Sequence, residues 1–258
     1  MFSSVNLFVM KEFKPCRVCQ SKQKENTRVP PGFIRTGTME SGFKYKECNC
    51  HKKWSQYRDV YLKSKGRGFN LNILDNIDDY VYKGVKSIDA VNKLKSSWPH
   101  SNIVYIYGPN GTQKTTTAQL LAFEQIKNNK SCYFILMSRL VDLLMKASSF
   151  NVDEETLTKL NKINNSDIVF IDEAFDSEKM TIFKSGWKTP FLDSFLRECL
   201  NSNIQLVFIS NIEPELIPEE KFSKSIKDLV LRESINNQFK LEDRFVDEME
   251  KWDGGSLF

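Results

Sequence analysis

The segment from Gly108 to Thr115 has the residue types of a phosphate-binding loop. It reads GPNGTQKT and lies between a short apolar run, VYIY, and a segment of helical character, TTTAQLLAFEQIKNN. Such a loop needs a tight turn whose backbone N–H groups converge on the anion, a helix N-terminus, a lysine for the β- and γ-phosphates and a hydroxyl for Mg²⁺. Lys114 and Thr115 fill the last two roles. We therefore expect ATP and Mg²⁺ to bind here, through Gly108, Pro109, Asn110, Gly111, Thr112, Gln113, Lys114, Thr115 and Thr116.

One residue of this loop departs from the usual pattern. Gln113 stands next to the lysine, where glycine would let the backbone approach the phosphates without a side chain. The departure predicts weaker binding or slower turnover at a site that is otherwise intact.

Polar residues follow two further apolar runs. Asp172 and Glu173 end the run DIVFI, 58 residues after Lys114, and Asn211 follows IQLVFIS. The aspartate can hold Mg²⁺ together with Thr115, and the glutamate can polarise an attacking water. The amide of Asn211 can orient that water. Each feature alone is also typical of a helix cap or a turn, so the prediction rests on their combination with the loop.

Four of the six cysteines are clustered near the N-terminus. Cys16 and Cys19 are separated by two residues, and Cys48, Cys50 and His51 follow 28 residues later. Thiolates at such spacing can share one tetrahedral Zn²⁺, whose binding would stabilise a module too small for a core of its own. The expected ligands are Cys16, Cys19, Cys48 and Cys50, with His51 as the alternative to Cys50. Cys132 and Cys199 lie in apolar surroundings and are expected to pack.

Beyond residue 102, short apolar runs alternate with longer amphipathic segments. The predicted strands are 103–107, 132–137, 168–171 and 204–209. The predicted helices lie near 114–128, 138–149, 153–164 and 189–201. This alternation predicts an α/β fold with a parallel sheet sandwiched by helices. Because the carboxyl ends of parallel strands meet at one edge, the loop, the acidic pair and Asn211 are expected to come together there.

The overall composition fits a soluble, cytoplasmic protein of more than one part. The chain has 258 residues, 40% hydrophobic and 27% charged, and no apolar window long enough to cross a membrane. The net charge of +4 hides an asymmetry, because residues 1–70 contain 15 Lys and Arg against 5 Asp and Glu. The remainder contains 22 against 28. We expect a basic zinc-binding module over 1–68, a linker with one helix near 87–97 over 69–100, and an ATPase domain over 101–258.

A basic helix is predicted after Cys50, ending near Gly66. Its aromatic residues Trp54, Tyr57 and Tyr61 recur at helical spacing among lysines and arginines. The rings could stack on nucleic-acid bases while the cations contact phosphates. Equally, they could form the buried face of an amphipathic helix. The basic module could therefore face either single-stranded DNA or a protein.

These motifs in this order resemble the AAA+ ATPases, and more narrowly the DnaC-type and phage replicative helicase loaders, with IstB-type transposition helpers as relatives. The resemblance spans about residues 12–250. It includes the pattern CRVC…CNCHKKW and the segment LEDRF, where Arg244 matches the arginine that AAA+ proteins insert into a neighbouring subunit's site. Arg232 is a weaker candidate for that role. The chain ends 14 residues after Arg244, which leads us to expect a lid domain that is absent or very short.

The resemblance implies an ATPase, with Glu173, Asn211 and Arg244 as catalytic residues and Thr115 and Asp172 at Mg²⁺. Its partners would be a replicative helicase, single-stranded DNA and further copies of the chain, in a bacterial cell or phage-infected host. An IstB-like transposition helper and a nucleotide-gated adaptor with little hydrolysis are the alternatives. A Ser-His-Asp or Cys-His hydrolase is not expected, because the only histidines are His51 and His100 and neither lies near a nucleophile motif.

Overall fold

The computed structural model describes residues 12–20, 30–36, 42, 44–75, 98–99, 101–176 and 188–241. The chain divides into two compact units, Met1–Lys63 and Ser64–Phe258. The helix expected near 87–97 and Arg244 both lie outside the described residues. Within the described ranges, no helix has the length and apolar character needed to cross a bilayer.

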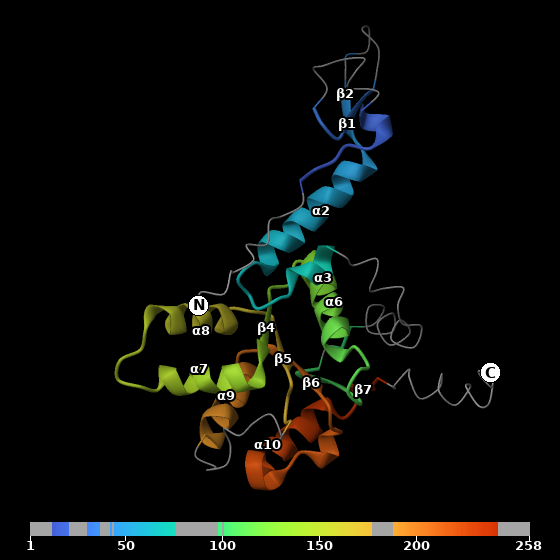
Figure 1. Ribbon diagram of the computed structural model, residues 1–258. Helices are drawn as coiled ribbons and strands as arrows, with labels where there is room; N and C mark the ends of the chain where they lie inside the picture. Colours follow the sequence, from blue (N-terminus) through green and yellow to red (C-terminus); the bar gives the residue numbers. More distant parts are fainter. Residues whose placement is uncertain are drawn as a thin grey trace, which may run out of the picture. The chain divides into compact units, whose positions relative to one another are not determined.

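The larger unit is built on a five-stranded parallel sheet (Figure 1). Its strands lie in the order β4-β5-β6-β3-β7. Their bounds are β3 Ile103–Tyr107, β4 Cys132–Leu136, β5 Ile168–Asp172, β6 Gln205–Ser210 and β7 Gln238–Lys240. Each of the first four coincides with a predicted strand to within one residue at either end. The predicted α/β fold with a parallel sheet is confirmed.

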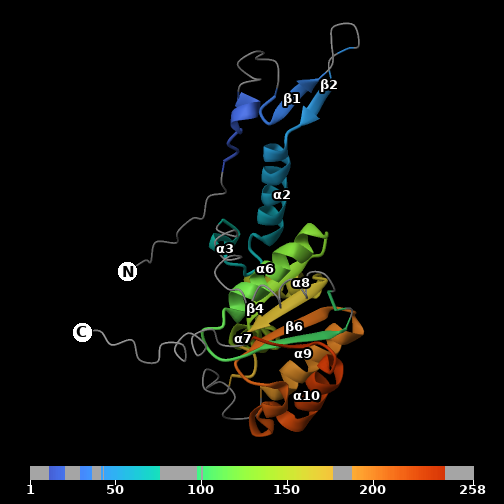
Figure 2. The same cartoon turned by 90° about the vertical axis from the view of Figure 1, so that its right-hand side faces the viewer.

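Helices cover both faces of this sheet. Figure 2 shows α6 (Lys114–Lys127) on one side and α9 (Thr189–Asn201) and α10 (Glu219–Ser234) on the other. In the described part of this unit, the remaining helices are α3 (Leu71–Asp75), α7 (Met137–Ala147), α8 (Glu154–Asn164) and the short 3₁₀ turn Pro214–Leu216. Burial on both faces explains why the strands read as continuous apolar runs. Alternate residues such as Tyr105 and Phe208 pack toward α7, α9 and α10 in one core cluster.

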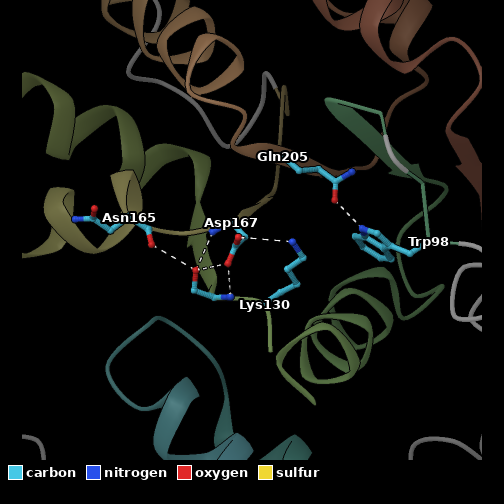
Figure 3. A network of polar contacts seen from close by, with 6 residues as sticks. Trp98, Lys130, Asn165, Asp167 and Gln205 are labelled. Carbon is cyan, nitrogen blue, oxygen red and sulfur yellow. Dashed lines mark hydrogen bonds and ion pairs between the residues drawn. The ribbon is translucent and has the colours of Figure 1, made fainter. Parts of the chain in front are cut away.

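Polar contacts join the amino ends of the strands (Figure 3). The Trp98 indole N–H donates to Gln205 Oε1 at 2.7 Å, and the Ser131 backbone and hydroxyl donate to Asp167. The carboxyl ends of the strands lie at the opposite edge. The predicted phosphate-binding loop and the acidic pair lie at that edge.

The segment after Ser64 runs along the edge strand β4. Phe134 N–H donates to the carbonyl of Arg67 at 2.9 Å, and Asn70 N–H donates to Gln119 Oε1 of α6 at 2.9 Å. The Phe69 ring lies 5.5 Å from that of Phe123, centroid to centroid. These contacts cover part of an edge that would otherwise expose unpaired backbone groups.

The smaller unit contains an antiparallel hairpin and a helix. Strands β1 (Phe33–Thr36) and β2 (Lys44–Glu47) pair, and α2 (Asn49–Ser64) follows. The basic helix predicted after Cys50 is thus confirmed. Its buried face includes Val60 and Tyr61, whereas Leu62 is 59% exposed.

Candidate nucleotide site and metal centre

The predicted phosphate-binding loop connects the end of β3 to the start of α6. Gly108, its first residue, has φ +152°, and a Cβ there would lie 2.1 Å from the carbonyl oxygen of Leu241. Leu241 N–H in turn donates to the carbonyl of Tyr107 at 2.7 Å. Only glycine can therefore occupy position 108 while the chain after β7 keeps this contact.

Lys114 is held within the loop that it closes. Its Nζ donates to the carbonyl of Pro109 and lies 3.4 Å from Thr112 Oγ1, while the Thr112 hydroxyl donates to the same carbonyl. The lysine is 7% exposed. The ammonium is thus placed at the loop itself rather than in bulk water, as a phosphate ligand must be.

Gln113 keeps the turn that glycine would usually provide. Its backbone adopts φ 59° and ψ 27°, in the left-handed region, and it immediately precedes the first residue of α6. Its side chain is exposed. The departure from the usual pattern therefore changes the conformational cost of the loop but not its path.

Thr115 and Asp172 are in direct contact, although 57 residues separate them. The Thr115 hydroxyl donates to Asp172 Oδ2 at 2.8 Å, and Glu173 N–H donates to Oδ1 at 2.8 Å. Burial raises the pKa of Asp172, and these two hydrogen bonds oppose the rise. A hydroxyl and a carboxylate oxygen side by side are hard oxygen ligands of the kind that Mg²⁺ prefers, so these residues fit the ion.

Glu173 and Asn211 face the same cleft as Lys114. The cleft has a volume of about 300 Å³ and is lined by Asn110, Gly111, Gln113, Lys114, Thr115, Asp172, Glu173, Ile209 and Asn211. The structure therefore brings the acidic pair, Asn211 and most of the loop together. Four predicted residues belong to the loop or its helix without lining the cleft: Gly108, Pro109, Thr112 and Thr116. Arg244 is outside the described residues.

Two features at this edge were not predicted from the sequence. Asp176 Oδ2 accepts a hydrogen bond from Asn211 Nδ2 at 3.0 Å, which fixes the amide. A second cavity of about 720 Å³ shares Thr115 and Asp172 with the cleft and extends to Arg139. The sequence shows that Asp176 lies close to the acidic pair at the end of β5. It does not show that Asp176 pairs with Asn211.

The four N-terminal cysteines converge on one point. Cys16 Sγ lies 3.6 Å from Cys19 Sγ and 3.8 Å from Cys48 Sγ, and Cys19 Sγ lies 3.4 Å from Cys50 Sγ. All four sulfur atoms lie within 4.8 Å of one another. Ligands at about 2.3 Å from a tetrahedral Zn²⁺ stand about 3.8 Å apart, so the arrangement fits a single ion. The cluster could therefore bind a metal.

His51 is turned to a different partner. Its Nδ1 lies 2.6 Å from Glu47 Oε1, and it is not part of the sulfur cluster. The geometry favours Cys50 over His51 as the fourth ligand. A hydrogen bond from the Cys19 backbone lowers the pKa of Cys16 to about 7, which favours the thiolate that a metal requires.

The two remaining cysteines are buried in the larger unit. Cys132 is 1% exposed and Cys199 is 2% exposed. Burial raises the pKa of each thiol to about 12. Both are packing residues, as their apolar surroundings suggested.

The fold and the cleft together define a P-loop nucleoside-triphosphatase architecture. The loop follows β3, and the acidic pair stands at the end of β5. Strand β6 lies between these two strands and is followed by Asn211. Residues 104–220 match the model of the family described as "ATPase family associated with various cellular activities (AAA)". This part of the larger unit is thus similar to AAA domains, and its cleft fits a nucleotide with Mg²⁺.

Several solved structures are similar to this chain. Domain III of the Thermotoga maritima replication initiation protein DnaA is 23% identical, with 64% of this chain and 65% of that chain covered and a TM-score of 0.48. The DnaI structure is 16% identical, covering 64% and 89%, with a TM-score of 0.48. The DnaC helicase loader is 16% identical, covering 65% and 96%, with a TM-score of 0.45. The chain thus spans slightly less than two thirds of the DnaA domain. No curated protein matches its sequence.

Proposed function

We propose that this protein is an ATP-dependent loader that delivers a replicative helicase onto single-stranded DNA, in the replication of a phage or a related mobile element. The observation that carries the proposal is the contact between Thr115 and Asp172 in a cleft that Lys114, Glu173 and Asn211 also line. The order of these motifs and the leading cysteine pattern support the loader class through the resemblance described above.

In this proposal each cleft residue has one task. Lys114 binds the β- and γ-phosphates, and Thr115 and Asp172 hold Mg²⁺, which neutralises charge on the phosphates when bound. Glu173 polarises the attacking water, and Asn211, fixed by Asp176, orients it. The four cysteines hold Zn²⁺ in the smaller unit.

Assembly would complete the site. An arginine from a neighbouring copy stabilises charge that develops on the transferred phosphate, so hydrolysis depends on self-association. Arg244 is the proposed residue. The weaker candidate, Arg232, lies on α10 with its side chain 68% exposed and its Nε 3.0 Å from Glu233 Oε1.

We expect Arg244→Ala to preserve ATP affinity and to lower DNA-stimulated hydrolysis about 1000-fold, the usual contribution of such an arginine. Steady-state phosphate release with and without single-stranded DNA measures this effect. Arg232→Ala is the matched control, and its turnover should stay near that of the wild type. Normal turnover of the Arg244 variant would remove this residue from the mechanism.

A second candidate function is a nucleotide-gated adaptor with little hydrolysis. Gln113 favours it, because its side chain stands where glycine usually allows close approach to phosphate. Turnover that stays negligible in the presence of DNA and partner would select the adaptor over the loader.

Partner identity tests the loader proposal. The intact protein, held with ATP and Mg²⁺, should capture a replicative helicase, and a loading assay should show helicase transferred to single-stranded DNA. Capture of a transposase instead would favour the transposition-helper alternative and contradict the loader.

A further inference from the structure

The smaller unit contains a cavity beside the first half of α2. Its volume is about 640 Å³, and its lining combines two aromatic with three charged residues: Glu12, Lys14, Lys53, Trp54 and Tyr57. All five residues lie in Met1–Lys63, so the cavity belongs to this unit alone. None of them lines the nucleotide cleft or belongs to the cysteine cluster. The cavity is therefore a feature that the proposed ATPase chemistry does not use.

The cavity separates the aromatic residues of α2 into two groups. Trp54 and Tyr57 are three residues apart, so they lie on one side of the helix, and both are half-buried. Tyr61, one turn further on, is 4% exposed and packs inside the unit. The rings of Phe13 and His51 lie 5.4 and 5.8 Å from the Trp54 ring, centroid to centroid, and hold it in place. Of the three rings that recur at helical spacing, one is thus a core residue and two line the cavity.

Positive charge lies next to the two rings. Lys14 and Lys53 line the same cavity, and both are exposed. Arg58 Cζ lies 5.0 Å from the Trp54 ring centroid, which adds a third cation at this ring. Among the described residues of the lining, Glu12 alone is acidic, so the cations outnumber the carboxylates. This charge would attract a polyanion to the rings.

We propose that this cavity binds single-stranded DNA, with Trp54 and Tyr57 stacking on bases and Lys14 and Lys53 contacting phosphates. Rings that stack on unpaired bases, beside cations that contact the backbone, are the combination that single-strand binding uses. An acidic peptide would need the cations alone and an apolar segment the rings alone, whereas the cavity offers both. The inference rests on the proposed function, because it names the surface on which the loader would meet the strand.

The lining also predicts how the bases are recognised. Its described residues include no amide side chain and no aliphatic hydroxyl, which are the groups that read base edges by hydrogen bonds. Stacking alone tolerates every base, because each has a π-face. An oligothymidylate and a mixed-sequence oligonucleotide of the same length should therefore bind with similar affinity.

Fluorescence anisotropy of the full-length protein with a labelled oligothymidylate tests the stacking. Tyr57→Ala should weaken binding about tenfold or more, and Tyr57→Phe should retain it, because phenylalanine keeps the stacking face. Tyr45→Ala is the matched control, since Tyr45 is an exposed ring on β2 of the same unit and does not line the cavity. Trp54→Phe should keep the affinity but lose the quenching of tryptophan fluorescence by the oligonucleotide. Unchanged quenching in that variant would contradict stacking at Trp54.

The salt dependence of binding tests the phosphate contacts. Lys14→Gln combined with Lys53→Gln should reduce the slope of log affinity against log salt by about 1.4, or about 0.7 for each contact. The control removes the same charge from β2, and Lys44→Gln combined with Lys46→Gln should leave the slope unchanged. Equal losses from the two pairs would overturn the proposal, since they would show a bulk charge effect. Metal content and circular dichroism of each variant report whether the unit still folds.

Four further outcomes separate this inference from the proposed function. Wild-type affinity in both Tyr57→Ala and the double variant of Lys14 and Lys53 would overturn the cavity site and leave the loader proposal standing. Loss of a captured protein partner in these variants, with DNA binding intact, would assign the cavity to that protein and also overturn the inference. DNA binding that depends on the cavity, without transfer of a helicase, would contradict the loader alone. Failure of the wild-type protein to bind the oligonucleotide, with or without ATP, would contradict both.

Discussion

Gln113 shows how a phosphate-binding loop can retain its path without the usual glycine. A non-glycine residue in the left-handed region costs about 1–2 kcal/mol relative to its preferred conformations. The loop keeps this conformation because α6 begins at Lys114 and because Lys114 and Thr112 both contact the Pro109 carbonyl. Contacts around the site thus offset the free-energy cost of this conformation.

At position 113 the glycine variant should be more stable than the alanine variant, which is the reverse of the order inside a helix. Gln113→Gly should be more stable than Gln113→Ala by about 0.5–1 kcal/mol, because the relief of left-handed strain exceeds the entropy that glycine loses on folding. Urea unfolding measures the difference. At Thr158, an exposed residue within α8, alanine should instead exceed glycine by about 1 kcal/mol. The same order at both positions would contradict the assigned conformation.

For individual residues, spacing in the sequence predicted their chemical roles better than it predicted which side chains they contact. Lys114, Thr115 and Asp172 could be assigned because residue type and strand-end position restrict what can bind phosphate and Mg²⁺. The bond between Asn211 and Asp176 could not be predicted, because it depends on the turn after β5, where Glu173 and Phe175 both have positive φ.

Among the elements of the larger unit, the edge strand β4 is covered by the chain segment that contains Gly68. Gly68 has φ +84°, and a Cβ there would lie 1.8 Å from the carbonyl oxygen of Phe134. The contact places the chain directly against the edge strand. Glycine is therefore required at position 68 for two reasons, the backbone conformation and the close approach.

Two glycine variants separate these reasons. Gly68→Ala should lower the free energy of unfolding by about 3 kcal/mol or more, because it combines left-handed strain with displacement of the Arg67–Phe134 hydrogen bond. Gly66→Ala should cost only about 1 kcal/mol, because Gly66 has φ +69° but its nearest neighbour is Lys162 Nζ at 3.4 Å. Chemical denaturation gives both values, and equal losses would contradict the close approach at Gly68.

Elements with a regular apolar pattern were predictable, and the others were not. Strands β3 to β6 are buried on both faces, so their apolar runs were continuous. Strand β2 reads KYKE and is exposed along its length, so it has no apolar alternation. Helix α10 was not predicted, and its helical geometry is interrupted at Ser223, where φ is 67°.

Across the whole molecule, the two units differ in net charge and also in the size of their buried apolar cores. The larger unit has an extensive buried core. In the described part of the smaller unit, the fully buried apolar residues are only Cys19, Val60 and Tyr61. The smaller unit therefore needs another source of folding energy, and the cysteine cluster fits that need.

Metal removal should affect one unit alone. We expect one zinc ion per chain, lost in Cys16→Ser or Cys48→Ser and retained in the matched variants Cys132→Ser and Cys199→Ser. A zinc-selective chelator that does not bind Mg²⁺ should unfold the smaller unit without changing ATP affinity, because the cleft lies entirely in Ser64–Phe258. Metal analysis and a nucleotide titration measure these effects. Absence of zinc from the wild-type protein would end the metal assignment.

A calorimetric titration of ATP with Mg²⁺ into the intact protein tests the nucleotide site most directly. The wild type should bind one nucleotide per chain, and Lys114→Ala should lose at least about 100-fold in affinity, because the ammonium that meets the phosphates is gone. Lys127→Ala, at the other end of α6, is the control and should bind as the wild type does. Unchanged affinity in Lys114→Ala, with the fold intact by circular dichroism, would contradict the assignment of the cleft as the nucleotide site.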